Sequence, residues 1–150
     1  MTQAIPLQTI CKQILDGQIG AFPCDTVWGI VGIAEPETIA KALAAKGRGN
    51  DSPFILLFPS TNHLEGYIKP LTDQQRVWEG EYWPGPVTLV FEALDTISPV
   101  LTGGRGTLAC RVPDFLPLNQ LLDSVDQPVF STSLNRHGHA PCQDIQDLDP

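Results

Sequence analysis

Basic residues are scarce in this chain. Nine Lys and Arg stand against 17 Asp and Glu over 150 residues, so the formal net charge is −8. Proteins that coat nucleic acid or anionic membranes show the opposite balance, because such partners reward an excess of Lys and Arg. The composition therefore excludes a general polyanion-coating protein, and any polyanionic ligand must be held by a local basic cluster.

Long apolar runs and regularly spaced cysteines are missing too. The densest apolar run covers residues 54–58, against the roughly 20 residues of a membrane helix. Residues 1–11 carry no charge and no long apolar run, which argues against a secretory signal. The cysteines form no C-x-x-C pair and no metal-ligand rhythm, which predicts free thiols; they are Cys11, Cys24, Cys110 and Cys142. We expect a cytoplasmic protein without membrane contact.

The chain does contain a regular alternation of helical and extended patterns. Helices are expected over residues 5–15, 36–47, 60–68, 72–83 and 116–125. Strands are expected over residues 18–22, 28–33, 54–58, 87–91, 107–112 and 129–131. No repeat or linker divides the chain. This order predicts a single α/β domain over residues 1–150, a length that can bury a sufficient core.

Two polar segments follow early elements of this pattern. At residues 23–29 a strand breaks into a turn that offers a thiol, a carboxylate and a hydroxyl, from Cys24, Asp25 and Thr26. This is either an ordinary turn in which Asp25 caps its own backbone or part of a site. At residues 46–50, Lys46 and Arg48 flank a glycine after a helix. They either complement the helix dipole or form an anion site, and the spacing is not that of a Walker loop.

Three later segments carry further polar groups. Residues 83–89 place two prolines around a glycine, a rigid corner that we interpret as architectural. Arg111 lies in a strand among apolar neighbours and needs an anionic partner, either a protein carboxylate or a ligand. Residues 131–139 bring three hydroxyls, an amide and two imidazoles together, which indicates a solvated turn or a polar ligand pocket. A zinc site at these histidines is disfavoured, because no third ligand has a recognisable spacing.

In chain order the motifs resemble those of the YrdC family, the threonylcarbamoyl-adenylate synthases. The resemblance spans about residues 17–141. The segments are Pro-Cys-Asp-Thr-Val-Trp-Gly, Lys-Gly-Arg with Ser-Pro-Phe, Trp-Pro-Gly-Pro-Val-Thr-Leu, Ala-Cys-Arg-Val-Pro and Ser-Thr-Ser-Leu-Asn. The resemblance implies a single-layer twisted mixed sheet with flanking helices and a concave basic face. It also implies that the C-terminal part of the usual domain is absent, and the chain departs from the usual pattern at Cys24, Leu134 and His137.

The resemblance implies an enzyme that condenses L-threonine, bicarbonate and ATP to threonylcarbamoyl-AMP and pyrophosphate. ATP is then a substrate that arrives with Mg²⁺, and the protein itself holds no metal. The product would pass to the tRNA threonylcarbamoyl-transferase machinery, with tRNA itself as a possible contact. A non-catalytic nucleotide- or RNA-binding module is the alternative, and transfer of another carbamoyl group, as in hydrogenase maturation, is a third.

Site residues are implied in the same way, position by position. Lys46 and Arg48 match the positions that contact the phosphates and support catalysis. The remaining nucleotide positions are Thr107, Ser133 and Asn135. Arg111 matches the position that pairs with the threonine carboxylate, and the rest of the threonine pocket corresponds to Cys24, Thr26 and Ser131.

Overall fold

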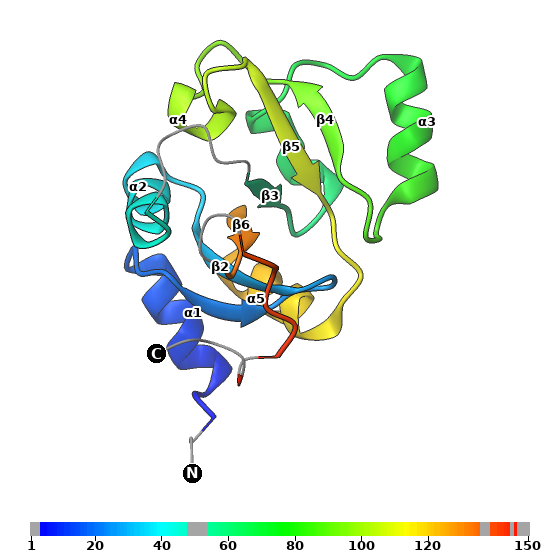
Figure 1. Cartoon of the computed structure of the whole chain (residues 1–150). Helices are drawn as coiled ribbons and strands as arrows, with labels where there is room; N and C mark the ends of the chain where they lie inside the picture. The colour runs from blue at the N-terminus through cyan, green and yellow to red at the C-terminus, as the bar shows by residue number, and fades with distance from the viewer. Residues whose placement is uncertain (1–3, 48–53, 136–138, 145, 147–150) are drawn as a thin grey trace.

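A six-stranded mixed sheet forms the centre of the computed structural model, which describes residues 4–47, 54–135, 139–144 and 146 (Figure 1). The strand order is β1-β2-β6-β3-β5-β4, and every neighbouring pair is antiparallel except β3 with β5. The strands are β1 (Gly20–Pro23), β2 (Trp28–Ile33), β3 (Ile55–Leu57), β4 (Leu89–Glu92), β5 (Thr107–Arg111) and β6 (Val129–Ser133). The predicted α/β fold with a mixed sheet is confirmed.

Helices connect and cover these strands. They are α1 (Leu7–Leu15), α2 (Pro36–Ala45), α3 (Asp73–Tyr82), α4 (Pro99–Thr102), α5 (Leu116–Val125) and the 3₁₀ helix η1 (Thr61–Gly66). Local signals start two of them as predicted: Pro36 opens α2, and Thr72 with Gln75 forms a reciprocal capping box at α3. The four-residue α4 was not expected, because it is too short to show a helical pattern of apolar residues.

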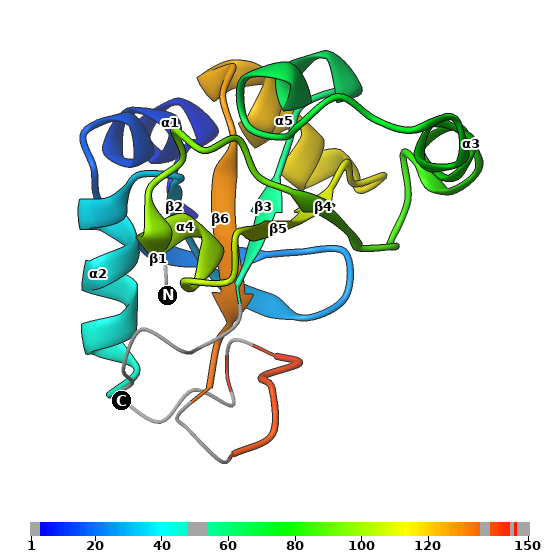
Figure 2. The ribbon, with the colours of Figure 1, turned by 90° about the horizontal axis from the view of Figure 1, so that it is seen from above.

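The two faces of the sheet have separate cores. On one face α1 and α5 pack against alternate strand residues that include Val31, Leu57 and Val129. On the other, α2 and α4 pack against the intervening residues, such as Ile30, Leu56 and Phe130. Figure 2 shows α1 and α5 beside each other, and α3 apart from the other helices. Because neighbouring strand residues point to opposite faces, each short strand contributes to both cores.

The end of β6 differs from the expected one. The strand continues past residue 131 to Ser133, because Thr132 and Ser133 pair with Ile30 and Gly29 of β2. Hydroxyl residues do not show the apolar alternation that marks a strand, so the sequence pattern predicted a strand that is two residues too short. The extension adds the hydroxyl side chains of Thr132 and Ser133 to that of Ser131 on the sheet itself. No helix in the described part of the chain is long and apolar enough to cross a membrane.

The packing of α5 predicts a position-dependent loss of stability. Leu121 is fully buried between α5 and the sheet, whereas Leu116 on the same helix is 69% exposed. Leu121→Ala should lower the free energy of unfolding by about 2–5 kcal/mol, since it leaves a cavity. Leu116→Ala should change it by about 0.5 kcal/mol or less. Urea unfolding followed by circular dichroism measures both, and equal losses would contradict the described packing.

Candidate functional site

A row of small and polar side chains lies at one end of the sheet. Gly29 on β2 pairs with Ser133 on β6, and Ser131 pairs with Ile55 on β3. Ser131 and Ser133 share the face of α1 and α5, whereas Thr132 points to the face of α2. Strand β6 therefore presents hydroxyl groups to both faces near its carboxyl end.

Gly29 keeps this end of the sheet open. A Cβ atom at this position would lie 2.7 Å from Ser131 Oγ and 3.1 Å from Cys24 Sγ. Both distances are shorter than normal van der Waals contact, so any side chain here would displace those two groups. The glycine thus lets the turn after β1 approach β6 closely.

Lys46 reaches the end of β6 from the opposite face. It lies directly after α2 and is only 5% exposed. Its Nζ donates to Thr132 Oγ1 at 3.0 Å and to the Ser133 carbonyl oxygen at 2.6 Å, and also approaches Ser133 Oγ and Asn135 Oδ1. A helix-capping role alone would leave this ammonium in solvent. The lysine is instead aimed at the hydroxyl and amide groups after β6.

Asn135 links this cluster to the segment that follows. Ser133 Oγ donates to Asn135 Oδ1 at 2.5 Å, and Asn135 Nδ2 donates to the His139 carbonyl oxygen at 2.7 Å. Lys46, Ser133 and Asn135 therefore form one connected polar group. Such a group, with a buried ammonium at its centre, suits an anion better than an apolar ligand.

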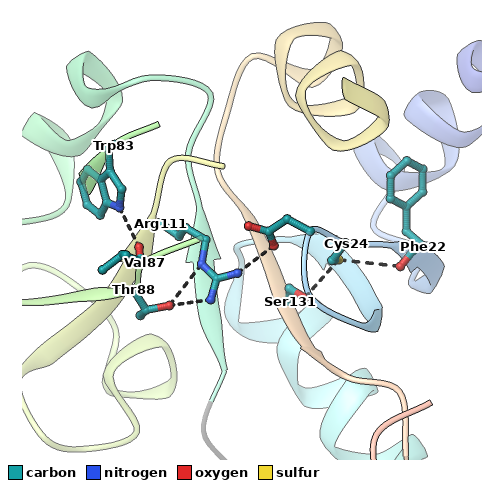
Figure 3. Close-up of polar contacts among 8 residues, drawn as sticks. Phe22, Cys24, Trp83, Val87, Thr88, Arg111 and Ser131 are labelled. Carbon is teal, nitrogen blue, oxygen red and sulfur yellow. Dashed lines mark hydrogen bonds and ion pairs between the residues drawn. The ribbon is translucent and has the colours of Figure 1, made fainter. Parts of the chain in front are cut away.

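Arg111 is held on two sides at the end of β5. Its Nη1 donates to Asp25 Oδ1 at 2.7 Å, and its Nε and Nη2 both donate to Thr88 Oγ1, at 3.2 and 2.8 Å (Figure 3). The Arg111 and Asp25 side chains are 10% and 7% exposed. The β4–β5 register, carried one residue further, places Thr88 opposite Arg111. The expected anionic partner of Arg111 is therefore a protein carboxylate, and Asp25 does not merely cap its own turn.

A count of donors shows what Arg111 retains. A guanidinium has five N–H groups, and three of them make the bonds to Asp25 and Thr88. One N–H on each terminal nitrogen has no protein acceptor among the described residues. These two groups remain as donors for an anionic ligand.

Cys24 packs beside this ion pair. Its Sγ lies 3.6 Å from Ser131 Oγ and 3.7 Å from the Phe22 carbonyl oxygen (Figure 3). Burial raises the pKa of the Cys24 thiol, an effect that the hydrogen bond with Ser131 only partly offsets. Cys24 is nevertheless the least buried of the four cysteines, all of which are free thiols. It is therefore a neutral group at neutral pH, small enough to leave space next to it.

A cavity of about 250 Å³ joins these groups. Its lining comes from the turn after β1, from β3 and from the ends of β5 and β6. The polar members are Cys24, Asp25, Thr26, Arg111, Ser131, Thr132 and Ser133, and the apolar members include Phe54, Ile55 and Leu57. This volume suits a small polar molecule, with an apolar wall on one side.

The structure brings together most of the predicted site residues. Cys24, Thr26, Arg111 and Ser131 line the cavity, and Ser133 connects it to Lys46 and Asn135. Arg48 and His137 lie outside the described residues. Leu134 packs against the core on the α2 face.

Thr107 lies apart from this cluster, at the start of β5. It does share the face of Arg111. Because β5 is parallel and β6 antiparallel to β3, Thr107 and Ser133 lie at the same end of the sheet, separated by the width of one strand. Two strand spacings make roughly 10 Å. Thr107 therefore lies on the same face and at the same end of the sheet as Ser133, two strands away from it.

Sequence reasoning missed three participants: Asp25 as the partner of Arg111, Thr88 as its second anchor, and Thr132 as an acceptor for Lys46. All three lie in segments that the sequence analysis singled out, but only Asp25 had a signal for its role, because a buried arginine requires a carboxylate. Within the described ranges no three or more His, Cys, Asp or Glu residues come together as a metal site would require.

Comparison with known proteins gives consistent matches over nearly the whole chain. The family model Sua5_yciO_yrdC, described as "Telomere recombination", matches residues 12–150. A protein of Photobacterium profundum named threonylcarbamoyl-AMP synthase is 32% identical over 145 residues, which cover 95% of this chain and 78% of that protein. The protein of the same name from Pyrococcus abyssi is 33% identical over 126 residues, 83% of this chain.

Solved structures agree with this result. The crystal structure of P. abyssi Sua5 complexed with L-threonine matches with a TM-score of 0.85 and 28% identity, and covers 93% of this chain. The match spans only 42% of that solved chain, and the sequence match spans 37% of the P. abyssi relative. The family model, the sequence relatives and the solved structures each match most of this chain and lead to the same assignment. The chain belongs to the Sua5/YciO/YrdC family.

Proposed function

We propose that this protein is a threonylcarbamoyl-AMP synthase, in which the cavity holds L-threonine and the cluster around Lys46 holds the phosphates of ATP. The observation that carries the proposal is that two buried cations border one cavity: Arg111 lines it, and Lys46 bonds Thr132 and Ser133 in its wall. Lys46 arrives from the α2 face and Arg111 from the other. Members of the family bearing this activity name, and a relative solved with L-threonine, support it.

The amino-acid subsite is built around Arg111. Its two remaining N–H groups would bind the threonine carboxylate as a bidentate pair, the geometry that a guanidinium favours. Ser131, Cys24 and Thr26 would surround the rest of the molecule, because all three line the same cavity. Cys24 contributes a weak donor and a soft surface to this pocket.

The nucleotide subsite would lie at the end of the sheet, next to the threonine. Lys46 would contact the phosphates together with Arg48, while Ser133 and Asn135 supply hydroxyl and amide groups. Thr107, on the same face and at the same end of the sheet as Ser133, would complete this subsite from the start of β5. Mg²⁺ would enter bound to the triphosphate and add positive charge there.

The proposed reaction would use this arrangement in two steps. The threonine nitrogen, once it has lost a proton, attacks the carbon of carbon dioxide derived from bicarbonate, and a carbamate forms. A carbamate oxygen then attacks the α-phosphorus of ATP, the bond to the β-phosphate oxygen breaks, and pyrophosphate leaves. The site's contribution is orientation of three small reactants and neutralisation of phosphate charge, since no nucleophilic side chain is needed.

The wider setting belongs to the same proposal. We expect residues 1–150 to act as one catalytic domain in the cytoplasm. The product would pass to the machinery that attaches threonylcarbamoyl groups to tRNA, and direct contact with tRNA is the less favoured extension because the chain is acidic.

Threonine-dependent release of pyrophosphate from ATP tests the activity. The wild-type protein with ATP, L-threonine, bicarbonate and Mg²⁺ should release pyrophosphate, and Lys46→Ala should release it about 10²–10³ times more slowly, as expected for loss of one charged contact at a reacting phosphate. Lys41→Ala is the matched control, because Lys41 lies on α2, the helix that Lys46 follows, but is exposed and donates to the Gly17 carbonyl oxygen. A Lys46→Ala rate equal to that of the control would contradict the proposed role. Nucleotide binding without turnover in the wild type would favour a non-catalytic binding module.

Alkylation of Cys24 tests the position of the threonine pocket. A small thiol reagent should modify Cys24 before the three buried cysteines in the native protein. Because burial raises the pKa of this thiol, its labelling rate should still be rising with pH above the ordinary thiol range. Saturating L-threonine should slow the labelling severalfold. Mass spectrometry measures the rate, Cys24→Ser supplies the blank, and an unchanged rate with threonine would place the amino acid elsewhere.

A further inference from the structure

Asp25 carries a buried oxygen that has no partner in the part of the chain that the structure describes. Its Oδ1 accepts the hydrogen bond from Arg111 at 2.7 Å. Its Oδ2 is the buried side-chain polar atom that, among the described residues, lacks any hydrogen bond. The side chain is more than nine-tenths buried, with 7% exposed. A carboxylate oxygen in such a place is costly, since it has lost water and gained no donor.

The position of this carboxylate indicates which donor is missing. Asp25 lines the same cavity as Arg111, Ser131 and Cys24. Arg111, the cation it faces there, already bonds its other oxygen. Lys46 points instead to Thr132 and Ser133 at the end of β6. No described residue donates to Oδ2, and water does not reach it, so an occupant of the cavity can donate to this oxygen once the Asp25 carboxylate turns toward the cavity.

An α-amino acid carries such a donor next to its carboxylate. If the carboxylate takes the two remaining N–H groups of Arg111, the amino group one carbon away lies beside the carboxylate that Arg111 holds. The ion pair is then complementary to an amino-acid zwitterion. Arg111 faces the ligand's carboxylate, and Asp25 faces its ammonium group. Carboxylic acids without an amino group would leave Oδ2 unpaired.

We propose that Asp25 Oδ2 accepts an N–H bond from the α-amino group of the bound amino acid, so that Asp25 and Arg111 select α-amino acids as a pair. The inference rests on the proposed function and assigns the residue that recognises the amine. It also defines the orientation of the reacting nitrogen. When the ammonium gives up two protons and gains the carboxyl carbon, the carbamate nitrogen keeps one N–H, which can donate to Oδ2 throughout.

A pair of ligands that differ only in the amino group tests the inference. L-threonine and (R)-3-hydroxybutyrate share the carboxylate, the hydroxyl and the methyl group. Calorimetric titration of the wild-type protein should show a preference for L-threonine of about tenfold or more, the value of one charge-assisted hydrogen bond. In Asp25→Asn a carboxylate oxygen is replaced by an amide nitrogen, which is a donor, so most of this preference should disappear.

Thr88→Val is the matched control. It removes the second anchor of Arg111 and leaves Asp25 in place, so both ligands should bind more weakly while their ratio stays near that of the wild type. If Asp25→Asn weakens both ligands by the same factor, Asp25 only holds Arg111, and the inference is overturned while the proposed function stands. If the wild type binds no L-threonine, the inference and the proposed function fall together.

A measurement on the wild type covers the case in which Asp25→Asn does not fold. The side-chain carboxyl ¹³C resonance of Asp25 can be assigned through its own backbone amide. L-threonine should shift this resonance well beyond the shift produced by (R)-3-hydroxybutyrate. Equal shifts with the two ligands would overturn the proposed contact.

Discussion

The buried ion pair between Arg111 and Asp25 is the interaction on which the site depends. It joins the turn after β1 to the end of β5, two segments 86 residues apart in sequence, and both side chains are at least nine-tenths buried. Removal of one partner from such a pair typically costs about 3–5 kcal/mol, because the remaining charge is left without compensation. The pair therefore both closes the cavity and keeps it polar. Thr88 lies directly before β4 and opposite Arg111, and its two hydrogen bonds hold the guanidinium in one orientation.

The two faces of the sheet explain how the site can handle two kinds of ligand. Alternation along β6 sends Ser131 and Ser133 to one face and Thr132 to the other. Lys46 can therefore approach from the α2 side and still meet Ser133 where the strand ends. Arg111 and Asp25 stay on the α1 and α5 side, with the cavity between them and Ser131. In the proposed function, an amino acid and a phosphate group would thus be held by separate cations that approach β6 from its two faces.

The sequence was informative where the physics is local. The capping box at Thr72, the proline that opens α2 and the apolar run of β3 each depend on residues close together, and all three were predicted. The need of Arg111 for an anion was also evident, because a charged side chain among apolar neighbours requires one. The sequence did not show which anion this is, because the pairing with Asp25 and the hydrogen bonds to Thr88 depend on strand order and register. The bonds of Lys46 to the end of β6 depend on the same long-range placement.

The chain is acidic overall, but two of its few basic residues lie at the candidate site. Lys46 and Arg111, two of only nine basic residues, are buried beside the same cavity, where they can act in a low-dielectric setting. Calorimetric titration of L-threonine into the wild-type protein, with and without ATP and Mg²⁺, tests this account most directly. We predict saturable binding of one threonine per chain in both conditions. No binding of threonine in either condition would contradict the claim that the Arg111 cavity is an amino-acid site.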